Sequence, residues 1–156
     1  MLVGMNKIGL FFFSGADGRE LMRLAKHAKS GMPEVDLGQV IIKAKEMNEK
    51  AKKIITIIRA TPGGEGLSED EIEKGAKRLY LERLGLGLGF AGASALFLYH
   101  GVENKNAITT LIGLFSCLSS FVVMRSMIYP YNTLSVIARL KISEQVLTEF
   151  GFNSQQ

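Results

Sequence analysis

The feature that most constrains this chain is a long run without a formal charge, Leu84–Val102. At 1.5 Å per residue a helix over this run spans about 28 Å, close to the roughly 30 Å hydrocarbon core of a bilayer. A second uncharged run, Ala107–Met124, follows a short polar loop. A soluble chain of 156 residues rarely needs two such helices in its core. The sequence therefore predicts two membrane spans joined as an antiparallel hairpin.

The glycines of the first run admit two interpretations. The string GLGFAG at Gly87–Gly92 fits the G-x-G-x-x-G fingerprint of dinucleotide-binding loops. That fingerprint needs a strand before it, whereas a capping box at Ser68 and Glu71 opens a predicted helix there. Small residues repeating every four positions favour close helix packing in lipid instead. The predicted packing interface comprises Gly85, Gly89, Gly92 and Ala93 on the first span, and Gly113, Ser116 and Ser120 on the second.

The stretch Gly85–Gly92 also resembles the first helix of the rotor-ring c subunit of rotary ATPases. The second helix of that subunit carries an ion-binding carboxylate at mid-membrane. The second span here has none, so a rotor function does not carry over. Neither span holds an ionisable residue near its centre, which argues against a proton path or substrate site within this chain.

Basic residues near the span ends set the expected orientation. Four precede the first span and three follow the second, whereas the connecting loop holds only Lys105. Both termini are therefore expected on the cytoplasmic or matrix side. Arg83 and Arg125, at the span ends, are expected to contact lipid headgroups.

A coiled-coil-like pattern runs from near Pro33–Asp36 to Arg59. Three heptads are too few to separate a seam for a partner from a helix packed on its own chain. A helix lying on the membrane is a third alternative, because several lysines follow one another there. The predicted seam, in steps of three and four, is Leu37, Val40, Ala44, Met47, Ala51, Ile54 and Ile58.

Shorter elements flank these regions. A helix is expected over Gly18–Ser30 with Asp17 as its cap, ended by Gly31 and Pro33. A final amphipathic helix is expected to follow a break at Pro130 and to end near Glu149. Residues 1–15 contain a short apolar run and are interpreted as an interfacial or packed anchor.

Little in the sequence points to chemistry. Cys117 has no disulfide partner in the chain. His27 is expected to be solvated, and His100 has no second histidine in the membrane part with which to bind a haem. We expect no catalytic residue, no cofactor and no metal. The net charge of +4 is spread through helices of mixed sign, so nucleic-acid binding is not expected.

The expected fold is an all-α membrane protein with three parts. Residues 1–66 form amphipathic and coiled-coil helices on the matrix or cytoplasmic side. Residues 67–132 form a juxtamembrane helix and a transmembrane hairpin with spans at about 84–102 and 107–128, and residues 133–156 form a C-terminal amphipathic helix and tail.

This architecture is typical of a non-catalytic accessory subunit that helps to assemble and stabilise a large energy-transducing membrane complex. A mitochondrial respiratory complex or ATP synthase is the expected setting, in the inner membrane with both termini in the matrix. The expected partners are other membrane subunits and phospholipids. The alternative is a self-oligomerising hairpin protein that shapes membranes or assists assembly.

Overall fold

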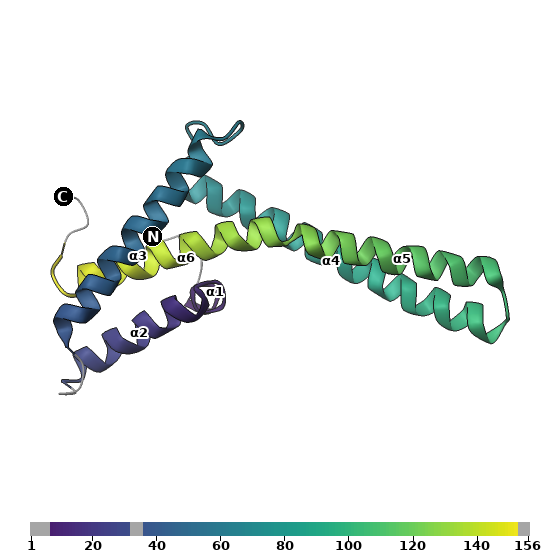
Figure 1. Cartoon of the computed structure of the whole chain (residues 1–156), viewed down its shortest axis with the longest axis horizontal. Coiled ribbons are helices and arrows are strands. Elements are labelled where there is room, and N and C mark those ends of the chain that lie inside the picture. The colour runs from purple at the N-terminus through teal and green to yellow at the C-terminus, as the bar shows by residue number, and fades with distance from the viewer. Residues whose placement is uncertain (1–6, 32–35, 153–156) are drawn as a thin grey trace. The chain divides into compact units, whose positions relative to one another are not determined.

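The computed structural model describes residues 7–31 and 36–152 of the chain, and its secondary structure over these residues is helical without strands. The prediction of an all-helical fold is confirmed for this part of the chain. The helices, in order, are α1 (Lys7–Phe13), α2 (Gly15–Lys29), α3 (Leu37–Ala60), α4 (Glu69–Glu103), α5 (Ala107–Ser126) and α6 (Ile128–Glu149) (Figure 1).

The chain divides into two compact units. Unit 1 contains the described residues up to Lys74 together with those from Asn132 onward, and unit 2 contains residues 75–131. The chain therefore passes between the units twice, once within α4 and once within α6.

Local side-chain signals determine where two of the helices begin. The predicted capping box is confirmed, because Glu71 Oε2 accepts hydrogen bonds from Ser68 N at 2.8 Å and from Ser68 Oγ at 2.7 Å. Ser68 Oγ accepts from Glu71 N in return, at 3.3 Å. At α3, Asp36 takes the N-cap position and accepts from Gly38 N at 2.9 Å. The contacts donated by Ser68 N, Glu71 N and Gly38 N each satisfy a backbone N–H that has no partner within the helix.

Two predicted boundaries differ from the structure. Helix α2 begins at Gly15, three residues before the predicted start, and Asp17 lies in its first turn, where its charge complements the helix dipole. Pro130 does not break the chain; Met127 separates α5 from α6, and Pro130 lies in the first turn of α6. A proline is tolerated there because its missing N–H would have had no partner within the helix. Gly31 follows α2 with φ +69°, whereas Pro33 lies outside the described residues.

The core of unit 1 forms where α2, α3 and the later part of α6 meet, with a contribution from the start of α4. One cluster of buried side chains joins α2, α3 and α6: Leu21, Ala25, Val40, Ala44, Met47, Ile142, Val146 and Leu147. A second cluster adds α4: Ala51, Ile55, Ile72, Ile137 and Leu140.

This core accounts for most of the predicted seam of α3. Val40, Ala44, Met47 and Ala51 are buried and Ile58 is partly buried, all within the chain itself. Leu37 and Ile54 remain 45% and 42% exposed. Ile55, one position after the predicted Ile54, is 2% exposed and takes its place in the core. Of the three alternatives for this helix, packing on its own chain explains the buried positions.

Polar side chains also enter the core of unit 1, and they are paired. Asn48 Nδ2 donates to Ser143 Oγ at 3.3 Å between α3 and α6. Lys141 Nζ forms an ion pair with Glu73, whose side chain is only 5% exposed, and lies 3.6 Å from Asp70 Oδ1. Buried charges of this kind are tolerated only when paired, so this contact fixes α6 against the start of α4.

Candidate functional site

Unit 2 is built around two apolar helical segments, which we call the helix pair: residues 75–103 of α4, and α5. Within residues 7–31 and 36–152, two helices are long and apolar enough to span a membrane, and these segments belong to them. Only 11% of the most apolar window of each helix is buried. The core helix of a soluble protein would be mostly buried, so burial in a soluble core does not explain this composition.

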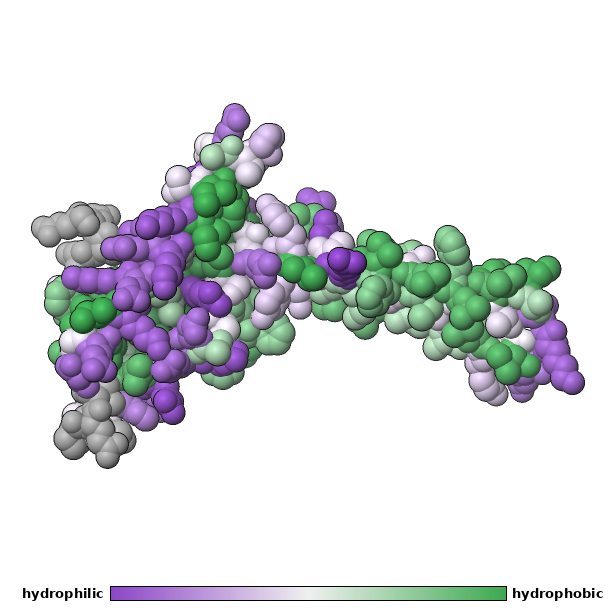
Figure 2. Space-filling model, in the orientation of Figure 1, coloured by the Kyte–Doolittle hydropathy of each residue, from purple (hydrophilic) through white to green (hydrophobic). Residues whose placement is uncertain are grey.

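Large apolar side chains cover the face of the helix pair that Figure 2 shows. Phe115 and Phe121 on α5 are 74% and 69% exposed, and Leu96 on α4 is 64% exposed. Soluble monomers rarely expose a continuous apolar surface of this extent. Figure 2 also shows hydrophilic side chains gathered at the end of the pair that carries the α4–α5 loop.

Two serine hydroxyls join the helices of the pair through the backbone. Ser94 Oγ donates to the carbonyl of Gly113 at 2.9 Å, and Ser120 Oγ donates to the carbonyl of Gly87 at 2.9 Å. Both serines are buried. A serine reaches the facing main chain only where the two backbones approach closely, and small residues permit that approach.

Two glycines between the helices, Gly101 and Gly113, leave no room for a side chain, and a third, Gly87, is closely packed. A Cβ at Gly113 would lie 2.8 Å from both N and Cγ of Leu98, and one at Gly101 would lie 2.6 Å from Thr110 N. A Cβ at Gly87 would lie 3.2 Å from Met124 Cγ. The face of α4 against α5 therefore follows Gly87, Ser94 and Gly101, spaced seven residues apart.

The seven-residue spacing is the signal that sequence reasoning missed. A seven-residue repeat brings side chains back to nearly the same face of a helix, as in left-handed helix pairs. Of the predicted packing residues, Gly113 and Ser120 lie between the helices, whereas Ala93 and Ser116 are half-buried.

The remaining predicted packing glycines lie on an open face. A Cβ at Gly85, Gly89 or Gly92 would meet nothing within 4 Å. At 3.6 residues per turn these three lie on the side of α4 opposite Gly87 and Ser94. Helix α4 therefore carries two small-residue faces, one occupied by α5 and one open within this chain.

The ends of the helix pair carry polar contacts. Arg83 Nη1, one of the two predicted lipid-headgroup residues, donates to the carbonyl of Ser126, whereas Arg125 is exposed. At the other end, Asn106 Oδ1 caps α5 by accepting from Ile108 N at 3.1 Å and Thr109 N at 3.2 Å. These contacts satisfy backbone groups at the two places where α5 begins and ends.

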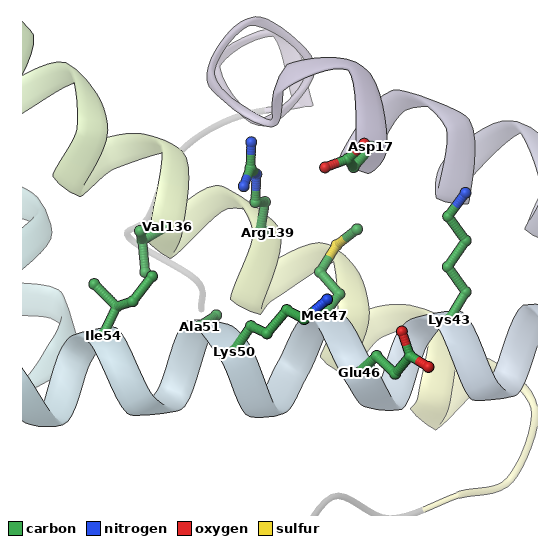
Figure 3. A pocket seen from close by; sticks show the side chains of 9 residues that line it. All are labelled: Asp17, Lys43, Glu46, Met47, Lys50, Ala51, Ile54, Val136 and Arg139. Atoms are coloured by element: carbon green, nitrogen blue, oxygen red, sulfur yellow. The ribbon is translucent and has the colours of Figure 1, made fainter.

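Unit 1 contains a cavity of about 140 Å³ between α2, α3 and α6 (Figure 3). Charges of both signs line it, and two of its cations are engaged within the chain. Lys43 pairs with Glu20 at 2.7 Å, and Arg139 Nε donates to the carbonyl of Ser14 at 3.2 Å. Its lining residues are Asp17, Lys43, Glu46, Met47, Lys50, Ala51, Ile54, Val136 and Arg139. This mixture favours no single class of ligand.

Comparisons with protein-family models, curated proteins and solved structures found no match for this chain. Among the described residues 7–31 and 36–152, no group of three or more His, Cys, Asp or Glu side chains could hold a metal ion. The helix pair, with its open glycine face, is the most distinctive surface of this part of the chain.

Proposed function

We propose that the chain is an integral membrane protein whose helix pair crosses the bilayer as an antiparallel hairpin, and that it serves as a non-catalytic accessory subunit of a larger membrane complex. One observation carries the proposal: α4 presents one small-residue face to α5 and a second, open one at Gly85, Gly89 and Gly92. The hairpin is complete without the second face, so that face is free to receive another helix.

The outer surface of the helix pair supports the membrane part of the proposal. Side chains such as Phe115 and Leu96 are solvated favourably by lipid, whereas in water their exposure would favour aggregation. The serine hydroxyls that lie between the helices donate to carbonyls of the pair, so no hydroxyl there needs water.

The open face supports the partner part of the proposal. Lipid tails provide almost no hydrophobic drive for association, so helices in a bilayer associate through close packing over small residues. Glycines at 85, 89 and 92 offer the close approach that a neighbouring helix requires. The partners are accordingly other membrane subunits, with phospholipids around the rest of the pair.

The kind of complex is proposed from the class of architecture. A short hairpin with a compact helical unit attached, and basic residues concentrated beyond the span ends, is typical of supporting subunits in energy-transducing membranes. We place the protein in the mitochondrial inner membrane, as an accessory subunit of a respiratory complex or ATP synthase, with both termini in the matrix.

The test is gentle detergent extraction, native gel separation and mass spectrometry of the species that migrate with the chain. Migration with the catalytic subunits of one complex would name the assembly. Migration with copies of itself alone would replace the accessory-subunit proposal with a self-oligomerising hairpin, because small-residue faces also join identical helices.

Two variants assign the interface. Gly89→Leu fills the open face and is expected to release the chain from its complex while the hairpin stays intact. Ala95→Leu adds a similar bulk on an exposed flank of α4 and is expected to migrate as the wild type does. Normal assembly of Gly89→Leu would show that the open face is not an interface.

A further inference from the structure

A second apolar surface lies outside the helix pair, on α1 (Lys7–Phe13). Ile8, Phe11 and Phe12 are 78%, 58% and 56% exposed. Their spacing of three and four residues puts all three on one face of the helix. These side chains form the α1 face, and they are large enough that leaving them in water is unfavourable.

The opposite side of α1 is held by unit 1. Leu10 packs against the core cluster of α2, α3 and α6. The chain turns directly from α1 into α2, where Ser14 N donates to the Leu10 carbonyl at 3.0 Å. Helix α1 is thus fixed with its apolar face pointing away from the core that anchors it.

One cationic side chain lies against the α1 face, and the segment that carries it has a net positive charge. The Arg19 guanidinium lies 5.6 Å from the centre of the Phe11 ring. Between residues 7 and 31 the chain carries five basic residues against two acidic ones, Asp17 and Glu20. An apolar face with a cation beside it, on a segment of net positive charge, is the combination that binds to the surface of an anionic bilayer.

The bilayer that the α1 face would contact is the one that the helix pair is proposed to span. This step rests on the proposed function, in which the helix pair spans the membrane. Unit 1 joins unit 2 at Lys74–Gly75 and at Tyr131–Asn132, with no linker at either junction. Wherever unit 1 lies relative to the pair, two covalent connections hold it beside the membrane surface.

We propose that α1 is a second membrane contact, in which Ile8, Phe11 and Phe12 enter the boundary between headgroups and acyl chains while Arg19 meets lipid phosphate. A lipid surface fits this face better than a protein does. Specific protein interfaces bury about 1,200–2,000 Å², whereas three side chains on one short helix cover far less. A bilayer requires only apolar side chains at the right depth and cations at the headgroups.

The chain contains no tryptophan, so a single introduced indole reports on one site without background. Phe12→Trp places it on the α1 face. Gln39→Trp places it at an exposed polar position of α3, as the aqueous control. Phe115→Trp places it near the middle of α5, as the bilayer control. Each variant is reconstituted as the full chain in vesicles containing anionic phospholipid, with bromine near either the headgroup end or the methyl end of the acyl chains.

Phe12→Trp is expected to lose roughly half of its emission in lipid brominated near the headgroup, and less in lipid brominated near the methyl end. Phe115→Trp is expected to show the reverse order, and Gln39→Trp little quenching with either lipid. If brominated lipid quenches Phe12→Trp no more than Gln39→Trp while it quenches Phe115→Trp, the α1 contact is overturned and the spanning hairpin is not. An unquenched Phe115→Trp would overturn the spanning hairpin, and the α1 contact with it.

Discussion

Replacing Gly113 with alanine tests whether the helix pair depends on the close approach of its two backbones. The added Cβ would lie 2.8 Å from both N and Cγ of Leu98. Because one of these atoms belongs to the main chain, a side-chain rotation does not relieve the clash. Helix α5 must move away from α4, which also lengthens the nearby hydrogen bond from Ser94 Oγ to the Gly113 carbonyl.

The size of the effect follows from two opposing terms. Overpacking a close contact costs about 1–3 kcal/mol, and replacing glycine by alanine inside a helix returns up to about 1 kcal/mol. With a cost near the middle of that range, the expected net loss in the stability of the pair is about 1 kcal/mol. Gly85→Ala is the matched control, because its Cβ meets nothing within 4 Å and only the favourable term applies. The two variants should therefore differ by roughly 2 kcal/mol, or about thirtyfold in the equilibrium constant.

Nitroxide labels on α4 and α5 measure this difference. Leu86 and Phe121 are exposed and lie close to the Gly87–Ser120 hydrogen bond, so cysteines at these positions report separation of the helices in a Cys117→Ser background. In a titration with sodium dodecyl sulfate, the labels should separate at the lowest detergent concentration in Gly113→Ala and at the highest in Gly85→Ala. Equal midpoints for the two variants would refute the argument that the glycines set the packing.

Three further outcomes follow from individual contacts. Ser120→Ala removes the hydrogen bond to the Gly87 carbonyl and should weaken the helix pair by about 0.6 kcal/mol, measured with the same labels; no change would show that the contact contributes nothing. Glu73→Leu leaves Lys141 in a largely buried site without its nearer partner and should lower the free energy of unfolding by about 3 kcal/mol. Thermal or chemical denaturation measures this loss, and an unchanged midpoint would mean that Asp70 alone is enough to compensate the charge of Lys141. Burial, and next the charge of Glu69, raises the pKa of Glu144 above its ordinary 4.5, so the native state holds this proton more tightly than the unfolded chain does. Stability contributed by this group therefore falls as pH rises above 4.5, and Glu144→Gln should flatten that decline, measured as the unfolding midpoint across this range.

Sequence reasoning succeeded where the signal is local. The capping box of Ser68 and Glu71 depends on residues three positions apart, and the structure contains it as predicted. Helices such as α3 are visible from apolar periodicity alone. The apolar character of the two candidate spans follows from composition, which tertiary structure does not change.

Positions that depend on how helices meet were harder to predict. The four-residue row of Gly85 and Gly89 is conspicuous in the sequence, yet the face that packs on α5 repeats every seven residues through Gly87 and Ser94. Both rows are composed of small residues, so composition does not distinguish them. The same holds for Ile54 and Ile55 of α3, because which of the two enters the core depends on where α6 and α4 contact the helix.

The loop between α4 and α5 bears on how such a protein would enter a membrane. If the helix pair inserts from one side as a preformed hairpin, this loop is the polar segment of the pair that must cross the bilayer. The loop region carries one acidic and one basic residue, Glu103 and Lys105, so their formal charges cancel. Asn106 already satisfies backbone N–H groups at the start of α5. The desolvation cost of translocation is thereby confined to a few side chains, and the flanking arginines and lysines stay on the side of entry.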